Sequence, residues 1–237
     1  MISKELLDKY YPRDQFDGTV IFYDWVRSFA KKNFVVLNLG AGSTSERKIK
    51  SLKNEVKTVF GADIDEAVIN NTDLEHKFVI ENNKLLFNDN FFDLIWSDFV
   101  LEHVKDPDLF LEEVYRTLKP NCSFFFRTPN KFHYVSIISK MTPHWFHKLV
   151  VKLVQEKDEN AHEPHLTYYK LNTENEIIKL SKKVGFKKTE LRFIETEPSY
   201  LLFNVCPFIL GLAYERIVNK FKQLYWLRAN IFGCLTK

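Results

Sequence analysis

Apolar and polar positions follow two different periods along the first half of the chain. Phe22, Trp25, Val26 and Phe29 recur at the spacing of one helix face, which predicts an amphipathic helix over Thr19–Lys32. Short continuous apolar runs follow, with the length and residue types of buried strands. The predicted strands are Phe34–Asn38, Thr58–Ala62, Phe78–Ile80, Phe92–Ser97 and Ser123–Thr128.

A second helix is marked between the last two of these strands. Asp106 can cap its first turn, Pro107 fits its first helical position, and Lys119-Pro120-Asn121 ends it. Its inner face consists of Leu111, Val114, Tyr115 and Leu118. Strands that alternate with helices predict an α/β fold, in which a parallel sheet carries helices on both faces.

The alternation stops after Thr128. The segment Pro129–Asn172 contains several His and is longer than an ordinary connection, so we expect it to carry function. Within it, Trp145–Val154 form an apolar stripe that suits a lid over the sheet edge. Thr173 begins a capping box for a helix that ends at Gly185. The remaining elements are predicted as a strand at Phe186–Ile194, a helical insertion at residues 200–227 and a closing strand at Ala229–Leu235.

Composition places the chain among globular proteins. It has 237 residues, 45% hydrophobic and 27% charged, which suits a large domain with a sizeable core. The net charge of +3 is too small to indicate a nucleic-acid partner, and the sequence has no dense basic stripe with interleaved aromatic residues. Cys122, Cys206 and Cys234 lack metal-type spacing, and the first residues lack the apolar core of a signal peptide. We therefore expect a cytoplasmic protein.

The run Tyr200–Tyr214 is strongly apolar. It is shorter than the ~20 residues of a membrane-spanning helix and contains Asn204, Pro207 and Gly211. We expect a buried helix pair here, and a membrane-surface element is the less favoured interpretation. With the 22 Phe of the chain, this run and the 145–154 stripe favour a largely apolar pocket for a small-molecule acceptor. The alternative is that the two stretches pack on each other and leave no cavity.

The first chemical signal is Val35–Ser43, where an apolar run ends in Gly40 and Gly42. Asp63 closes the next apolar run, at a spacing typical of a nucleotide-sugar site. Glycines let a ligand lie against the backbone, and a carboxylate can accept hydrogen bonds from ribose hydroxyls. A dinucleotide fingerprint needs a third glycine for the pyrophosphate, but Ser45 stands there. The pattern thus favours S-adenosylmethionine over a nicotinamide cofactor, and a tight turn without a ligand is the other interpretation.

Four ordered segments extend this signal: VVLNLGAGS (35–43), VFGADIDEAVINN (59–71), LLFNDNFFDLIWSDFVLEHVKDP (85–107) and EVYRTLKPNCSFFFRTPN (113–130). With them the chain resembles the class I S-adenosylmethionine-dependent methyltransferases, in particular the group that includes the ubiquinone-biosynthesis O-methyltransferases. The resemblance covers residues 34–130. It implies a Rossmann-like seven-stranded sheet, mostly parallel with an antiparallel last strand, with the cofactor at the carboxyl ends of the first strands.

The resemblance also implies ten cofactor-binding residues. They are, in chain order, Asn38, Gly40, Ala41, Gly42, Asp63, Ile64, Glu81, Asn82, Ser97 and Asp98. The first four would lie beside the methionine moiety, the next two at the ribose, the next pair at the adenine amino group and the last pair beside the sulfonium. The chain departs from the family pattern at Asn38, which replaces a commonly acidic residue, at Thr44, which replaces a small one, and at the turn Asn121-Cys122, which replaces two glycines.

Methyl transfer to a hydroxyl group needs a base, and an imidazole suits that role near neutral pH. His103 follows the fourth strand and should lie on the cofactor rim, although it could equally hold the loop through a backbone hydrogen bond. His133 lies in the segment where this fold places substrate contacts. In some quinone-pathway relatives, a carboxylate three positions before a Glu-His pair joins that pair in binding a divalent metal. Here the pair is Glu102-His103 and the third position is Phe99, so we expect no metal.

We therefore expect one methyltransferase domain over residues 1–237, with a cofactor-binding core at 34–130 and lid or substrate insertions at 131–172 and 199–227. The expected function is S-adenosylmethionine-dependent methylation of a small molecule, at oxygen. The rival hypothesis is a catalytically silent module that keeps the fold as a binding module. Asn38 and Thr44 favour the rival, whereas Asp63, Glu81 and the pair Glu102-His103 argue against it.

Overall fold

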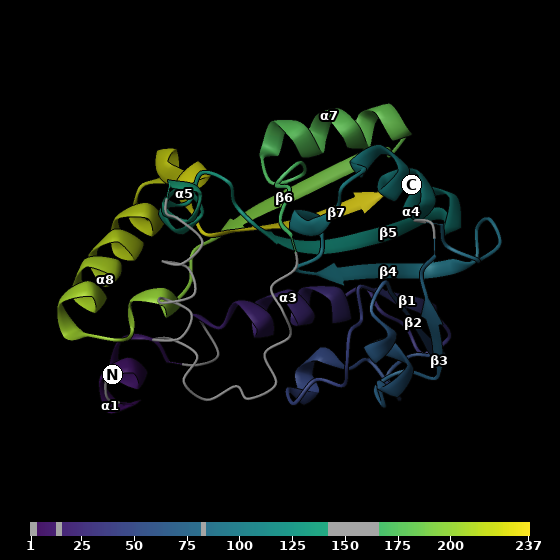
Figure 1. Cartoon of the computed structure of the whole chain (residues 1–237), viewed down its shortest axis with the longest axis horizontal. Helices are drawn as coiled ribbons and strands as arrows, with labels where there is room; N and C mark the ends of the chain where they lie inside the picture. The colour runs from purple at the N-terminus through teal and green to yellow at the C-terminus, as the bar shows by residue number, and fades with distance from the viewer. Residues whose placement is uncertain (1–3, 13–15, 82–83, 142–165) are drawn as a thin grey trace. The chain divides into compact units, whose positions relative to one another are not determined.

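A computed structural model describes residues 4–12, 16–81, 84–141 and 166–237. Within them, seven strands form one sheet in the order β3-β2-β1-β4-β5-β7-β6 (Figure 1). The strands predicted from the apolar runs are all present, which confirms the α/β fold class. Their bounds are β1 (Val35–Leu39), β2 (Thr58–Asp63), β3 (His76–Val79), β4 (Phe92–Asp98), β5 (Leu118–Pro129), β6 (Lys188–Ile194) and β7 (Asn230–Thr236).

The sheet is parallel from β3 to β5 and antiparallel around β7. β1 pairs in parallel with β2 and with β4. β2 also pairs in parallel with β3, and β4 with β5. At one end of β5, Lys237 N donates to Cys122 O at 3.1 Å. At the other end, Asn130 N donates to Ala229 O at 2.8 Å, so residue numbers rise along β5 as they fall along β7. The expected antiparallel last strand is therefore confirmed.

Helix caps form where the sequence signals them. Asp106 Oδ1 accepts from Leu109 N at 3.2 Å, and Thr173 Oγ1 accepts from Glu176 N at 3.3 Å. Gly185 ends its helix with a φ of 112°. The helices are α1 (Lys4–Tyr10), α3 (Gly18–Arg27), α4 (Pro107–Thr117), α5 (Tyr134–Met141), α7 (Glu174–Val184) and α8 (Val205–Lys220), with single 3₁₀ turns at Lys48–Lys50, Glu66–Asn70, Leu101–His103, Ser199–Leu201 and Lys222–Leu227.

Two predicted helix ends are wrong. α3 stops at Arg27 instead of Lys32, because Phe29 N and Ala30 N bond to carbonyls three residues back and so tighten the last turn. α4 stops at Thr117, and the predicted turn at 119–121 lies inside β5, where Asn121 takes a φ of 62°. Residues 119–121 are therefore part of strand β5, whereas the sequence pattern had placed them in a turn at the end of the helix.

Adjacent phenylalanines of β5 place helices on both faces of the sheet. Successive side chains of a strand point to opposite faces. Phe125 packs edge-on against Trp25 of α3, with ring centroids 5.1 Å apart, whereas Phe124 packs against Phe110 of α4 at 6.2 Å. α3 therefore covers one face and α4 the other, and α7 lies beside α4 (Figure 1).

The chain divides into two compact units, and each is described here by itself. The larger unit, residues 22–128, 167–192 and 231–237, contains most of the sheet with α4 and α7. The smaller unit, residues 1–21, 129–166 and 193–230, contains α1, α5 and α8. The expected lid stripe at 145–154 lies outside the described residues.

The run Tyr200–Tyr214 is not the predicted buried helix pair. Asn204 Oδ1 accepts from Cys206 N at 3.2 Å and so begins α8, and Pro207 fits its first turn. The run is thus a 3₁₀ turn followed by the first half of one helix. Leu210 on this helix is 71% exposed, so the segment is not buried all round. No helix of the described residues combines the length and the apolar character that crossing a membrane requires.

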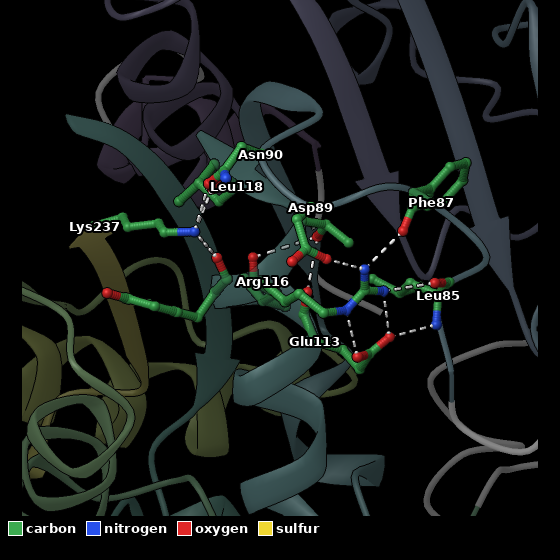
Figure 2. A network of polar contacts seen from close by, with 11 residues as sticks. Leu85, Phe87, Asp89, Asn90, Glu113, Arg116, Leu118 and Lys237 are labelled. Atoms are coloured by element: carbon green, nitrogen blue, oxygen red, sulfur yellow. Dashed lines mark hydrogen bonds and ion pairs between the residues drawn. The ribbon is translucent and has the colours of Figure 1, made fainter. Parts of the chain in front are cut away.

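Arg116 ties the connection between β3 and β4 to helix α4 (Figure 2). Its guanidinium binds both carboxylate oxygens of Glu113 at 2.8 and 2.9 Å. It also donates to the carbonyl oxygens of Leu85 at 2.8 Å and Phe87 at 2.7 Å. Glu113 completes the network by accepting from Leu85 N at 2.9 Å. A planar fork of five donors suits this set of acceptors, so Arg116 fixes the path of the connection.

We expect Arg116→Met to lower the free energy of unfolding by about 2 kcal/mol, because two main-chain carbonyls and Glu113 lose their donor. The expected loss of stability is small because 32% of the Arg116 side chain is exposed, and solvent weakens its ion pairs. Urea denaturation measures it. Lys183→Met is the control, since this exposed lysine pairs with Asp108 on the surface and its replacement should leave stability nearly unchanged. Equal stability of the two variants would remove Arg116 from this role.

Candidate active site

The glycine turn after β1 lies at the carboxyl edge of the sheet. Gly40 N donates to Ala62 O at 2.7 Å, which continues the pairing of β1 with β2 beyond the strand. Gly40 and Gly42 have φ values of 80° and 51°, a region that favours glycine. A Cβ at Gly40 would overlap the side chain of Val100, whereas a Cβ at Gly42 would meet no atom within 4 Å among the described residues beyond its chain neighbours. Gly40 is therefore needed for packing, and Gly42 leaves open backbone for a ligand.

Asp63 stands at the end of β2 and holds this turn. Its Oδ2 accepts from Gly42 N at 2.7 Å, and its Oδ1 accepts from Asp65 N at 3.0 Å. Each carboxylate oxygen has a second acceptor position, so the pair can still take two hydroxyl donors. Ile64, the next residue, is 63% exposed and offers an apolar contact. The residues present thus fit an adenosyl group: open backbone, a carboxylate and an apolar side chain lie together.

Asn71, which was not among the predicted cofactor-binding residues, also holds the glycine turn. Its Nδ2 lies 3.0–3.1 Å from the carbonyl oxygens of Ala41, Gly42 and Ser43, and the side chain is buried. Asn71 Oδ1 accepts from Asp73 N at 2.9 Å, which fixes the amide in place. The only signal in the sequence was its place at the end of the second resembling segment.

Thr44, a departure from the family pattern, also stabilises the loop. Its hydroxyl oxygen accepts from Thr72 N at 2.8 Å. The residue therefore ties the glycine turn to the segment after the 3₁₀ helix of 66–70, instead of leaving a gap there. Of the remaining predicted contacts, Asn38 and Ala41 are partly exposed and Glu81 is exposed. Asn82 lies outside the described residues.

Ser97 and Asp98 leave β4, but their side chains are not offered to a ligand. Ser97 is fully buried, and its hydroxyl finds no partner among the described residues. Asp98 binds Arg127 of β5 through two hydrogen bonds of 2.6 and 2.7 Å. Both partners of this ion pair are more than 90% buried. A ligand beside this segment would therefore meet its backbone and not these two polar groups.

Phe99 follows in the left-handed region, with a φ of 58°. A non-glycine residue in this region is strained and is often found at a functional site. Its N donates to Arg127 O at 2.9 Å, and its ring lies 4.3 Å from the Arg127 guanidinium. Because 39% of Phe99 remains exposed, the strained backbone presents an aromatic face at the carboxyl end of β4.

Glu102 and His103 lie on the 3₁₀ turn 101–103, and their environments differ. Glu102 is buried and accepts from Thr128 Oγ1 at 3.0 Å, and that hydroxyl in turn accepts from Asn172 Nδ2 at 2.7 Å. Its carbonyl oxygen accepts from Tyr168 N at 2.7 Å, so residues 168–172 pack against this turn. Burial raises the pKa of the Glu102 carboxyl to about 7. His103 is partly exposed on the same turn.

We expect Glu102→Gln to remove a pH dependence of stability between about pH 4.5 and 7. In this window the folded state holds a proton on Glu102 that the unfolded chain has lost, so the wild type loses stability as the pH rises, by about 1.4 kcal/mol per pH unit. Urea denaturation at pH 5 and pH 7 measures the change. The wild type should lose about 2 kcal/mol more than the variant. Glu112→Gln, at an exposed position on α4, is the control and should follow the wild type.

His133, the second predicted catalytic histidine, lies in the smaller unit at the start of α5 and is buried. Its Nε2 is 3.6 Å from Glu195 Oε2 and has no hydrogen-bond partner among the described residues. Burial lowers the pKa of His133 to about 4 and raises the pKa of Glu195 to about 8. Burial therefore favours the neutral form of both side chains. The described residues contain no group of three or more His, Cys, Asp or Glu arranged to bind a metal ion.

Comparisons with known proteins agree with this geometry. The family model described as "Methyltransferase domain" matches residues 37–126, which include the glycine turn, Asp63 and the β4 segment. No curated protein matches the chain.

Solved structures share the fold along nearly the whole chain. A putative methyltransferase of Haloferax volcanii, solved with its Trm112 activator, has a TM-score of 0.56 at 16% identity, covering 98% of this chain and 92% of that one. A SAM-dependent methyltransferase of Archaeoglobus fulgidus has a TM-score of 0.55 at 16% identity, covering 99% and 100%. A putative S-adenosylmethionine-dependent methyltransferase of Listeria monocytogenes has 0.54 at 15% identity, covering 91% and 97%. Residues 37–126 thus match a methyltransferase domain, and the chain shares its fold with these solved structures over nearly its whole length.

Proposed function

We propose that the protein methylates a small, largely apolar molecule at oxygen. The observation that supports the cofactor site most directly is the open backbone at Gly42, next to the Asp63 carboxylate. The methionine moiety would lie along residues 40–42 and the ribose at Asp63. When bound, S-adenosylmethionine supplies an activated methyl group, so the chain's own residues need only orient the acceptor and take up its proton.

The acceptor class is inferred from the side chains near the sulfonium segment. Asp98 is neutralised by Arg127, and Ser97 is buried, so neither would bind a polar group of the acceptor. Phe99 instead presents an aromatic ring, held in place by its left-handed backbone and by Arg127. An aromatic or otherwise apolar acceptor fits this surface better than a sugar.

His103 is the proposed base within the larger unit. It lies three residues after Val100, the side chain that packs against Gly40, on a turn that Glu102 anchors from the buried side. His133 remains the second proposed catalytic histidine.

Calorimetry with S-adenosylmethionine and S-adenosylhomocysteine tests the cofactor, and a panel of phenols, aliphatic alcohols and sugars tests the acceptor. Methylated phenol or alcohol, identified by mass spectrometry, is the expected result. A folded protein that binds neither adenosyl ligand would overturn the proposal. Binding of both without turnover on any acceptor would favour the rival hypothesis of a catalytically silent module.

A further inference from the structure

Helix α8 of the smaller unit has an apolar face that remains exposed. Val205, Ile209 and Ile217 are about half exposed, at 50%, 55% and 49%, and Leu210 is exposed to 71%. Val205, Ile209 and Ile217 are separated by multiples of four residues, and Leu210 is next to Ile209, so all four lie on one side of the helix. The opposite side is also apolar, with Phe208 and Val218 buried. A helix that is apolar on both sides is expected to be covered on both, so its outer side needs a further partner.

The charges along this helix all have one sign on the exposed side. Between residues 199 and 229 the chain contains a single acidic residue, Glu215, which is 1% exposed. Its carboxylate is taken up by Tyr11, Arg216 and Asn219. Lys220 and Lys222 are exposed at the end of the helix, and Arg216 is exposed one turn earlier. The partner of this face is therefore expected to be negatively charged.

Aromatic side chains continue the apolar face beyond the helix. Phe221, Tyr225 and Trp226 are exposed to 49%, 38% and 45% in the turn that follows α8. Trp and Tyr combine an apolar ring with a polar group, and they are enriched where a protein meets the boundary between lipid and water. Apolar side chains, lysines and aromatic rings on one helical segment are the typical composition of an interfacial helix.

We propose that this surface, the α8 face, binds an anionic lipid bilayer. It is defined by Val205, Ile209, Leu210, Ile217, Phe221 and Trp226, with Lys220 and Lys222 as its charged part. The apolar side chains would enter the headgroup region while the lysines contact anionic lipids. A second copy of the chain fits less well, because a two-fold contact between α8 faces would bring like charges together without a carboxylate to pair them. The inference does not depend on the identity of the methyl acceptor.

Cosedimentation of the full chain with sucrose-loaded vesicles tests the proposal. We expect binding to phosphatidylcholine vesicles that contain about 30% phosphatidylglycerol, and binding at least about fivefold weaker without the anionic lipid. Leu210→Glu should weaken binding to the anionic vesicles at least about tenfold, because a carboxylate replaces the most exposed apolar side chain of the face. The double variant Lys220→Glu, Lys222→Glu should weaken it by a similar factor.

Leu86→Glu is the matched control. This leucine is 80% exposed and lies in the larger unit, so the same substitution should leave vesicle binding within about twofold. Circular dichroism melting and S-adenosylhomocysteine affinity show whether each variant is folded. The proposal is overturned if the wild-type protein binds neither type of vesicle. A second outcome also overturns it: light scattering shows a dimer, Leu210→Glu dissociates this dimer, and the wild type binds no vesicles. The α8 face would then join two copies of the chain.

Discussion

Gly42→Ala is expected to lower the affinity for S-adenosylmethionine at least about tenfold while the protein stays folded. In the part of the chain that the structure describes, a methyl group at this position meets no atom within 4 Å beyond its chain neighbours, so it enters the space along the backbone where the ligand would lie. The left-handed φ of 51° adds strain of about 1 kcal/mol, which a folded domain tolerates. Calorimetry gives the affinity, and urea denaturation gives the stability.

Gly40→Ala is the matched variant, with the same substitution two residues away. Here the new methyl group would overlap Val100, a stiff β-branched side chain, and the φ of 80° is also unfavourable. We expect a loss of about 3 kcal/mol in the free energy of unfolding. The two glycines of one motif therefore have different roles. A Gly42→Ala protein that binds the cofactor like the wild type would place the ligand elsewhere.

Much of the fold followed from local patterns. The strand runs, the cap at Asp106 and the capping box at Thr173 all depend on residues close in sequence, and the structure contains each of them. The parallel pairing of the first five strands also follows from the alternation of strands and helices, since parallel neighbours need a crossover between them.

The site was less predictable, because its support comes from residues far apart in the chain. Asn71 contacts a turn 28–30 residues before it, and Arg127 pairs with Asp98 29 residues away. No periodicity signals either contact. The apolar run 200–214 was misjudged for a related reason: hydropathy shows that side chains are apolar, but not whether a second element covers them.

Asp63→Ala is expected to lower the affinity for S-adenosylmethionine by at least about tenfold. A buried hydrogen bond to a charged group contributes about 1.5–3 kcal/mol, and each 1.4 kcal/mol is one decade in affinity. The variant also frees Gly42 N and Asp65 N, which now bond to this carboxylate. Glu112→Ala, on the exposed side of α4, should bind like the wild type.

Two ligands separate the ribose contact from the loosened turn. Adenosine and 2′-deoxyadenosine differ only in one hydroxyl group, so a ribose-binding carboxylate should favour adenosine by about fivefold or more in the wild-type protein. A loosened turn would weaken both ligands equally and keep their ratio. Loss of the hydroxyl partner would instead bring the ratio close to one in Asp63→Ala. Competition against S-adenosylhomocysteine measures both affinities, and an unchanged ratio in the variant would restrict Asp63 to holding the glycine turn.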